Sequence, residues 1–598
     1  MSRGLFIAAA LLAASACTVT RDRPNLANQD VRVTVLHTSD IHSRLFPYEF
    51  VPNRFDQDYG LLPDNAPFGG IARIASIVAS ERSTAPRSLW LDSGDSFQGA
   101  PVFNLFKGEV EVRALSRAGL DAAVIGNHEF DLGSQNLFEQ IDKWATYRPL
   151  AANYVFEDPI NPDQPSLRDV VEPYTIFDLD GVTVGVIGMA NWSSMTGIFE
   201  GGNSLGIRPL DDSTVVANYA RLLRPAVDVV VVLSHLGLDE DEGLGSHEIE
   251  VDKNEFLPLE DVDVILGGHL HIVLNPPKVV TDVDGNQAIL AHSGAFAKYV
   301  GRLDLVVRVG TDNADPDTRS RVTAFSYDVI PVDDTVPSDR DVTELLQPYS
   351  LELNRRYDLQ GVFAVVNTAG DDKITRNDTS GGDSQLGNLV ARSMQLRAGV
   401  EAEFALTNSL GIRADFEQGP LTIEQMFNVF PFENSITVMY LSGLEVQEML
   451  DFNARKSASR GCRTQAQTAG IWHDMVCSSS SCPDGAFACA KNIYLGDDCR
   501  DGNPDGEIDT AKCSPLVPTA LYRVAVNDYI ARGGSGFEVL ERNTSKIDTG
   551  ISLRDALTDF LRGQPACTDQ TLIDAFGSVA CLDTTVEPHD GRIRAVFE

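Results

Sequence analysis

The sequence predicts an α/β domain followed by a separate α+β domain. At 598 residues, of which 43% are hydrophobic, the chain has enough apolar material for two or more cores. Between residues 31 and 330, short apolar or β-branched runs alternate with polar clusters and often with helical stretches, as in VDVVVVLSHLG and VDVILGGHLH. Such continuous runs are typical of strands buried on both faces. We therefore expect a sheet that helices cover on both sides.

Ahead of this domain, the first 17 residues predict a secretion signal. They read MSRGLFIAAALLAASAC, with a basic start at Arg3, an apolar run over residues 5–14 and small residues before Cys17. The run is shorter than the roughly 20 residues of a transmembrane helix. Either a signal peptidase cleaves after the ASA triplet, or Cys17 receives a lipid as in bacterial lipoproteins. We expect an exported protein of the bacterial cell envelope, periplasmic, lipid-anchored or secreted, with residues 18–30 as a linker.

The charge of the chain argues against nucleic acid as a partner. Asp and Glu number 86 against 48 Lys and Arg, which gives a formal net charge of −38. Such a chain repels extended polyanions. A small anionic substrate would need a local reversal of the field, which bound divalent ions and a few arginines can supply.

Polar side chains recur just after the predicted strands of residues 31–330. In open α/β sheets, ligands gather beyond the carboxyl ends of the strands, so these side chains are expected to lie together. These polar side chains include five of the ten histidines of the chain, four of them candidate metal ligands and the fifth His128. Carboxylate, imidazole and amide groups together suit zinc or manganese. The candidate metal ligands are Asp40, His42, Asp95, Asn127, His235, His269 and His271.

Seven ligands are too many for one tetrahedral ion and suit a pair of ions that share a carboxylate. Two ions about 3.5 to 4 Å apart lower the pKa of the water that they bind and neutralise phosphoryl oxygens. The pattern therefore predicts hydrolysis of a phosphate ester.

Residues 331–360 predict a helical connector and a candidate hinge. The stretch VPSDRDVTELLQPYSLELNRRY is polar and charged. A second domain over residues 361–598 mixes strands such as SITVMYLSG with helices such as SQLGNLVARSMQL.

Eight of the nine cysteines lie in the last quarter of the chain. An even number in an exported chain predicts four disulfides, with the pairing left open. A zinc cluster is the alternative, although no CxxC pair occurs. Residues 460–515, rich in Ser, Gly, Asp and Cys, are expected to form an irregular, disulfide-bonded insertion. The eight cysteines are Cys462, Cys477, Cys482, Cys489, Cys499, Cys513, Cys567 and Cys581.

Five motifs resemble, in this order, those of the calcineurin-like metallophosphoesterases. They are DIH at 40–42, GD at 94–95, GNHEFD at 126–131, a single histidine at 235 and GHLH at 268–271. With its second domain, the mature chain resembles the 5′-nucleotidase family, which includes ecto-5′-nucleotidase and bacterial UDP-sugar hydrolase. The resemblance implies a four-layer metallophosphoesterase β-sandwich flanked by helices over residues 31–330, followed by an α+β substrate-binding domain.

The resemblance also implies a role for each polar residue. One ion would be held by Asp40, His42, Asp95 and His271, and the other by Asp95, Asn127, His235 and His269, with Asp95 bridging. His128 would stabilise the transition state or protonate the leaving oxygen, oriented by Asp131. Relatives carry His, Asn or Gln at the place of His271, so His269 is the firmer assignment of the two.

Two stretches of the second domain resemble the substrate-binding segments of the family. NSLGIRADFEQGPLTIEQMFNVFPFEN implies that Arg413 binds phosphate, that Phe432 stacks on a base and that Asn408 is a further substrate-binding residue. NDYIARGGSGFEVL supplies Tyr529 as the second aromatic side chain. A planar guanidinium suits phosphate oxygens. Arg376, upstream of SQLGNL, resembles another phosphate-binding arginine, with a surface arginine as the alternative.

Ser535 departs from the family pattern. Relatives usually have GGDG, where the aspartate contacts the ribose hydroxyls, and this chain has GGSG. A serine lacks the charge and the reach to bridge two hydroxyls, so a deoxyribose or non-nucleoside phosphate becomes a candidate substrate.

One stretch of the insertion resembles the start of a calcium loop. The residues DGNPDGEID, from Asp501 to Asp509, place oxygens at the expected spacing, but the twelfth position is Lys512 and not glutamate. An ordinary turn is the preferred interpretation, with Ca²⁺ as the alternative.

Together these observations predict an exported phosphohydrolase with two divalent ions that removes the 5′-phosphate from nucleoside monophosphates. Nucleotide pyrophosphates such as UDP-sugars are further candidate substrates. The alternatives are a 2′,3′-cyclic nucleotide phosphodiesterase with 3′-nucleotidase activity, a sulfur-compound hydrolase of similar build, and a non-catalytic nucleotide-binding surface lipoprotein. The sequence leaves the oligomeric state open.

Overall fold

The computed structural model describes residues 24–157, 166–191, 206–210, 212–237, 261–281, 287–368, 373–377, 380–478, 482–500 and 502–597. The predicted signal and Cys17 lie outside these ranges, as do residues 18–23 of the linker after them. Among the described helices, none combines the length and the apolar character that a membrane crossing requires.

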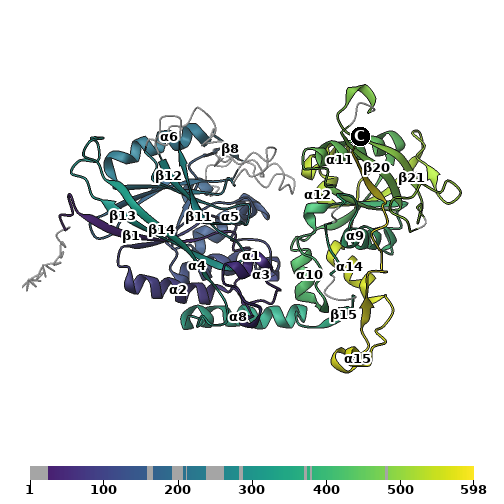
Figure 1. The fold of residues 1–598 in the computed structure, drawn as a ribbon, viewed down its shortest axis with the longest axis horizontal. Coiled ribbons are helices and arrows are strands. Elements are labelled where there is room, and N and C mark those ends of the chain that lie inside the picture. The colour runs from purple at the N-terminus through teal and green to yellow at the C-terminus, as the bar shows by residue number, and fades with distance from the viewer. Residues whose placement is uncertain are drawn as a thin grey trace, which may run out of the picture.

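The first domain contains two six-stranded sheets (Figure 1). In one sheet the strand order is β14-β13-β1-β2-β3-β4, and in the other it is β11-β12-β10-β9-β7-β6. The strands of the first sheet are β1 (Asp30–Thr38), β2 (Ser88–Asp92), β3 (Ala122–Val124), β4 (Arg148–Leu150), β13 (Tyr299–Arg308) and β14 (Arg321–Pro331). Those of the second are β6 (Tyr174–Asp178), β7 (Thr183–Met189), β9 (Val229–Ser234), β10 (Val264–Gly267), β11 (Val273–Thr281) and β12 (Gln287–Ser293).

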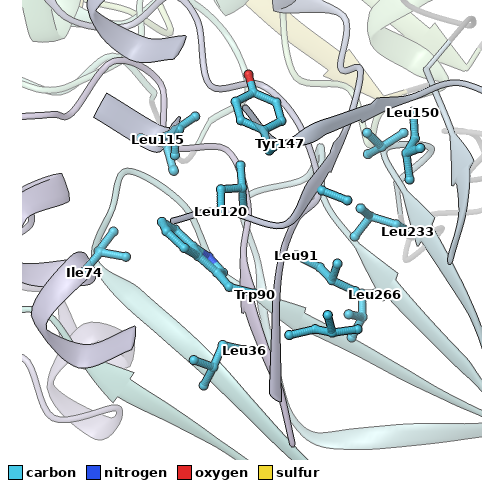
Figure 2. Close-up of a cluster of buried hydrophobic side chains, with 14 of the residues drawn as sticks. Leu36, Ile74, Trp90, Leu91, Leu115, Leu120, Tyr147, Leu150, Leu233 and Leu266 are labelled. Carbon is cyan, nitrogen blue, oxygen red and sulfur yellow. The ribbon is translucent and has the colours of Figure 1, made fainter. Parts of the chain in front are cut away.

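The two sheets pack face to face, and their apolar side chains form one core. Leu36 and Leu91 from the first sheet belong to the same buried cluster as Leu233 and Leu266 from the second (Figure 2). Interdigitated inner faces of this kind define a β-sandwich. The sandwich implied by the family resemblance is therefore confirmed.

Helices cover the outer face of each sheet. Ile74 of α2 (Ile71–Thr84) and Leu115 of α4 (Glu109–Ala118) join the core of the first sheet. Side chains of α6 (Asp212–Leu223) pack against the outer face of the second. The expectation of one sheet with helices on both faces was wrong, because an apolar strand looks the same whether a helix or another sheet covers it.

A single long helix connects the two domains. The predicted helix within residues 331–360 is α8 (Arg340–Tyr357), which begins after the N-cap Asp339. Its buried side chains Val342, Leu346 and Leu353 belong to the first-domain core. In Figure 1, α8 runs beneath the first domain and leads to β15 (Val362–Val366) of the second.

The second domain is of the α+β class, and its described residues form three sheets and several helices. Its five-stranded sheet has the order β19-β16-β23-β18-β24. The strands named below are β15 (Val362–Val366), β16 (Phe404–Asn408), β18 (Ser435–Ser442), β23 (Leu521–Asn527) and β24 (Ile547–Ser552). The main helices are α9 (Gln385–Leu396), α10 (Ile423–Val429), α11 (Gly443–Ala458) and α14 (Leu553–Arg562).

The predicted four disulfides are all present. They join Cys462 to Cys477, Cys482 to Cys489, Cys499 to Cys513 and Cys567 to Cys581. The first three lie within residues 460–515. The expectation that this stretch is irregular was wrong, because it forms β19 (Ala466–Ala469), β20 (Ile471–Ser478), β21 (Cys489–Leu495) and β22 (Ser514–Pro515).

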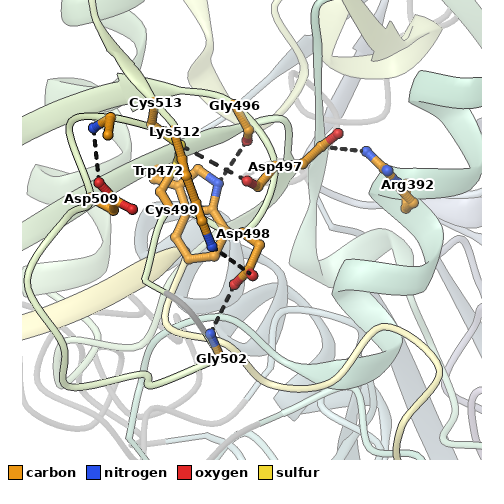
Figure 3. Close-up of a disulfide and its surroundings, with 11 residues drawn as sticks. Arg392, Trp472, Gly496, Asp497, Asp498, Cys499, Gly502, Asp509, Lys512 and Cys513 are labelled. Atoms are coloured by element: carbon orange, nitrogen blue, oxygen red, sulfur yellow. Dashed lines mark hydrogen bonds and ion pairs between the residues drawn. A yellow bond between two sulfur atoms is a disulfide. The ribbon is translucent and has the colours of Figure 1, made fainter.

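The turn at the proposed calcium loop lies beside the Cys499–Cys513 disulfide (Figure 3). Its first predicted ligand, Asp501, falls outside the described residues. Lys512 lies 3.7 Å from the carboxylate of Asp498, and Arg500 donates a hydrogen bond to the Gly506 carbonyl. Calcium binding at this turn stays a prediction.

Candidate functional site

The ends of five strands bring the predicted metal ligands together. β1, β2 and β3 run parallel in one sheet, and β9 and β10 run parallel in the other, so their carboxyl ends meet at one edge of the sandwich. Five of the seven predicted ligands have a left-handed backbone, with φ between 48° and 77°. Such conformations cost about 1 to 3 kcal/mol each and cluster at functional sites. The five are Asp40, His42, Asp95, His269 and His271.

Glycines are required where the loops of this edge touch. A Cβ added to Gly268, between the second sheet and His269, would lie 2.7 Å from Ser39 Oγ and 3.0 Å from His235 Nδ1. A Cβ on Gly126 would lie 2.3 Å from the carboxylate of Asp95. Gly268, directly before HLH, therefore allows close approach to the first sheet.

Two clusters of ligand atoms form at this edge. Asp40, His42 and His271 make the first cluster, with the Nε2 atoms of the two histidines 2.9 Å apart. Nδ1 of His42 lies 2.8 Å from the Gln98 carbonyl, so it carries the proton and Nε2 offers a lone pair. This is the arrangement of a histidine that binds a metal.

Asp95, His235 and His269 make the second cluster. Asp95 Oδ2 lies 3.0 Å from His235 Nε2 and 3.9 Å from His42 Nε2, so this carboxylate stands between the two clusters. The Oδ1 atom of Asn127 is buried and has no hydrogen-bond partner in the described part of the chain. Its orphaned oxygen fits a ligand role.

Burial keeps most of these imidazoles neutral. It lowers the pKa of His42 and of His269 to about 3. Burial would also lower the pKa of His235, but the charge of Asp95 outweighs it and raises that pKa to about 10. A ligating imidazole is neutral, so a bound cation would replace this proton.

Glu129 holds two ligand loops together, a role that the sequence analysis missed. Its Oε2 accepts hydrogen bonds from the backbone N–H groups of Asp95, at 3.0 Å, and Gly126, at 2.7 Å. Its Oε1 accepts from the N–H groups of Ser96 and Phe97, at 2.7 and 3.2 Å. One buried carboxylate thus fixes the loops after β2 and β3. Its place in GNHEFD was the available signal, but the partners in the loop after β2 lie 32 to 34 residues away.

His128 lies beside these clusters. Its Nδ1 is 3.1 Å from both carboxylate oxygens of Asp131, and its backbone N–H donates to Asp95 Oδ1 at 2.8 Å. Burial lowers the pKa of His128, but the charges of Asp131 and Asp95 outweigh that effect and raise it to about 9. These two carboxylates therefore favour the protonated form of the His128 ring.

The second domain places two predicted residues against this site. Arg413 and Phe432 line a cavity of about 310 Å³ together with His42 and His128. The rings of His128 and Phe432 are stacked, with centroids 5.7 Å apart. The guanidinium carbon of Arg413 lies 6.0 Å from the Phe432 centroid.

Four other predicted substrate residues do not line this cavity. The backbone N–H of Arg376 donates to Asp415, and its guanidinium donates to the Ile412 carbonyl. Asn408 is buried and accepts a hydrogen bond from Asn527 at 2.6 Å.

Tyr529 and Ser535, the other two, contact each other. The backbone N–H of Ser535 donates to the Tyr529 hydroxyl at 3.0 Å, and the two hydroxyl oxygens are 3.4 Å apart. A base between Phe432 and Tyr529 stays a prediction.

Comparison with known proteins gives the family. A model described as calcineurin-like phosphoesterase matches residues 33–273, and one described as 5′-nucleotidase, C-terminal domain matches residues 362–542. The chain belongs to the 5′-nucleotidase family. It has the family's two-domain fold and is a metal-dependent phosphoesterase.

Relatives in this family match over most of their length. The 5′-nucleotidase of Vibrio cholerae is 24% identical over 94% of this chain and 96% of the relative, and that of Bos taurus is 25% identical over 87% and 86%. The solved 5′-nucleotidase precursor from Thermus thermophilus is 25% identical, with a TM-score of 0.73 over 95% of this chain and 99% of that one. A sulfate thiohydrolase from Thermus thermophilus is 16% identical with a TM-score of 0.65 over 96% and 98%, which shows a shared fold alone.

Proposed function

We propose that this member of the 5′-nucleotidase family is an exported enzyme that removes the 5′-phosphate from nucleoside monophosphates with two bound divalent ions. One observation carries the proposal. A cation and an aromatic ring from the second domain, Arg413 and Phe432, share one cavity with His128 and His42 at the ligand clusters of the first. A phosphate at the clusters and a base on the ring are the two ends of a nucleotide.

The donor set fits a pair of ions. The buried Oδ1 of Asn127 has no hydrogen-bond partner within the described residues, and the buried carboxylates of Asp40 and Asp95 lie among the imidazoles of the two clusters. Buried anions need a compensating charge. Mixed nitrogen and oxygen donors suit Zn²⁺ or Mn²⁺. When bound, two such ions supply Lewis-acid stabilisation of the phosphoryl oxygens and an activated water.

The protein's own groups bind the phosphate and move a proton. The side chain of Arg413 is half-buried in the cavity wall and offers planar donors to phosphoryl oxygens. His128 faces Asp131 through Nδ1, which leaves Nε2 to donate a proton to the leaving oxygen. Its raised pKa keeps that proton on the ring until it is needed.

The remaining second-domain residues would contact the nucleoside or support the phosphate loop. The Phe432 ring offers an apolar face for a base. We assign Arg376 and Asn408 to support of the phosphate loop, since Arg376 bonds to the carbonyl next to Arg413. Ser535 stands where relatives have an aspartate that contacts the ribose hydroxyls, and its backbone N–H bonds to Tyr529. We therefore expect the enzyme to discriminate only weakly between ribonucleotides and deoxyribonucleotides.

Export is supported by the cysteines. Four disulfides in one domain are typical of proteins that fold in an oxidising compartment. Together with the sequence of residues 1–17, they favour a place in the bacterial envelope, with a lipid on Cys17 as the proposed anchor.

Phosphate release from AMP tests the proposal. Purified protein loaded with Zn²⁺ or Mn²⁺ is compared with His128→Ala, and the variant is expected to lose about 10²- to 10⁴-fold in kcat. Equal rates for both proteins would refute the proposed role of His128. A panel of deoxynucleotides, 2′,3′-cyclic nucleotides and nucleotide sugars then defines the substrate class, and a preference for the cyclic nucleotides would replace the 5′-nucleotidase assignment.

A further inference from the structure

A short segment of the second domain is basic, although the chain as a whole is acidic. Between Asp451 and Asp474 the sequence contains four lysine or arginine side chains and no carboxylate, in a chain with a formal net charge of −38. Within the described residues, none of the four forms an ion pair. The segment therefore reverses the field of the chain locally, as binding of an anion requires. The four are Arg455, Lys456, Arg460 and Arg463.

Lys456 contacts one of the segments proposed to bind the nucleoside. It lies in the last turn of α11, and its ammonium donates a hydrogen bond to the Ser535 carbonyl at 2.5 Å. The backbone N–H of Ser535 donates in turn to the Tyr529 hydroxyl. Burial and the charge of Arg460 lower the pKa of Lys456 to about 8. The ammonium thus lies close to the proposed second aromatic side chain and has no counter-charge.

Arg460 is linked to the other such segment. It follows Lys456 by four residues, and its guanidinium donates to Gln465 Oε1 at 2.9 Å. The Gln465 carbonyl accepts a hydrogen bond from the backbone N–H of Ser409, also at 2.9 Å, in the stretch that leads to Arg413. Burial lowers the pKa of Arg460 as well. The two cations are therefore tied to both substrate-binding segments of the second domain.

The position of these cations limits which anion can bind. Lys456 and Arg460 do not line the cavity at the ligand clusters, where the 5′-phosphate is proposed to bind. Both side chains are partly buried, which suits a small anion better than an extended one. Next to the proposed base-stacking tyrosine, the part of a nucleotide that can carry a further charge is the sugar. Relatives usually carry an aspartate where this chain has Ser535, and a carboxylate there would repel such a charge.

We propose that Lys456 and Arg460 bind a phosphate group on the 2′ or 3′ hydroxyl of the nucleotide, so that nucleoside bisphosphates are preferred substrates. The inference rests on the proposed function, since it places the 5′-phosphate at the ligand clusters. Water hydrolyses the 5′ ester, which releases orthophosphate and leaves the other phosphate on the sugar. Lys456 keeps two further donors for that phosphate, and Arg460 adds a charge-assisted contact. Both are specificity-determining residues.

The competing role for these cations is structural. Cationic side chains in the last turn of a helix are stabilising, and Lys456 also holds the Ser535 carbonyl. Arg455 separates the two roles, because it lies in the same turn but makes no hydrogen bond to either segment among the described residues. Arg455→Gln, which removes the same charge, is therefore the matched control for Lys456→Gln. Arg460→Gln leaves the contact with Ser535 intact and serves as a second variant if Lys456→Gln disturbs that loop.

Steady-state kinetics on Mn²⁺-loaded protein test the subsite. The substrates are AMP, adenosine 3′,5′-bisphosphate and its 2′,5′ isomer, and chromatography identifies the products. In the wild type, KM for at least one bisphosphate is expected to be at least about tenfold below that for AMP. Lys456→Gln and Arg460→Gln should remove this difference by raising KM for the bisphosphate about tenfold. Arg455→Gln should keep the difference within about twofold.

Three results would overturn the subsite. They are a wild type with equal KM values, variants of Lys456 and Arg460 that behave like Arg455→Gln, and release of the sugar phosphate before the 5′-phosphate, which would place that group at the clusters. A protein that releases no phosphate from AMP would refute the proposed function alone. Calorimetry with the same three nucleotides would then measure the preference without turnover, and the same ratios are expected between the dissociation constants.

Discussion

The two domains contribute to one cavity in different ways. The first domain supplies ligands from the ends of β1, β2, β3, β9 and β10, where parallel pairing fixes their positions. The second domain supplies Arg413 and Phe432 from the irregular segments before and after α10, and their approach to His128 depends on how the domains meet. The candidate metal site is therefore built within one domain, whereas the selection of substrate depends on the interface between the two domains.

The largest loss of activity is expected from a change in the second ligand cluster. His269→Ala should lower kcat for AMP by about 10³-fold, since a lost ligand removes several kcal/mol of transition-state stabilisation. His271→Gln should weaken one metal and keep measurable activity. Steady-state kinetics at saturating Mn²⁺ measure both variants, and similar residual rates would contradict the proposed division between the two histidines.

A smaller effect, on metal affinity, is expected from Glu129, which holds the loops that carry the ligands. Glu129→Gln replaces an acceptor by an N–H₂ group that faces backbone N–H donors. Partners of this kind typically contribute about 10- to 100-fold in metal affinity. Titration with Mn²⁺ should show this loss, and Glu139→Gln, an exposed change on the following helix, is the matched control. Unchanged affinity in Glu129→Gln would remove its positioning role.

Phe432 tests the interface side of the comparison. Stacking of a base on an aromatic ring contributes about 1 to 3 kcal/mol, so Phe432→Ala should raise KM for AMP by roughly 5- to 100-fold. Metal affinity should not change, because the ring holds no ligand. Phe487→Ala, at a position 58% exposed and outside the cavity, provides the control. A fall in metal affinity in Phe432→Ala would show that metal binding by the first domain depends on the second domain.

Changes in the disulfide-rich sheet are expected to affect stability and to have the smallest effect on substrate binding. The buried carboxylate of Asp474 on β20 accepts hydrogen bonds from Arg500 and Arg594. Burial would raise the pKa of Asp474, but these arginines and Asn492 lower it below its usual value. A lowered folded-state pKa adds stability above the unfolded pKa of about 4, and this is lost as pH falls through the folded value.

Asp474→Asn should therefore lower Tm at pH 7, by roughly 5 °C or more, and by progressively less below about pH 4. Thermal melts across pH measure this difference, and KM for AMP should be unchanged. A constant difference in Tm across the pH range would contradict the ion pairing of Asp474.

Local patterns in the sequence predicted one part of the molecule better than the other. Asp40, Asp95 and His269 follow apolar strands, so a topological rule was enough to bring them together. The fold around them was predicted only through the family resemblance, because apolar strands do not show what covers them. The link that Glu129 makes between two loops could not be predicted, since its partners in the loop after β2 lie 32 to 34 residues away.

In the second domain, amino-acid composition led to a wrong prediction of secondary structure. Residues 460–515 contain six cysteines and many turn formers, yet IWHDMVCS forms the buried strand β20. Arg413 and Phe432 were found through the family motif, as was Tyr529, with a base expected between Phe432 and Tyr529. The hydroxyl of Tyr529 accepts a hydrogen bond from the backbone N–H of Ser535, an interaction that no spacing rule could predict.

The central claim is that the two ligand clusters hold a pair of ions that share Asp95, and the metal content of active protein tests it most directly. Mass spectrometry of wild-type protein, dialysed after loading with Zn²⁺ or Mn²⁺, is expected to find two ions per chain. His271→Ala should retain about one, and Asp95→Ala fewer than one. A wild type that hydrolyses AMP with a single ion, or an Asp95→Ala variant that keeps both, would contradict the account.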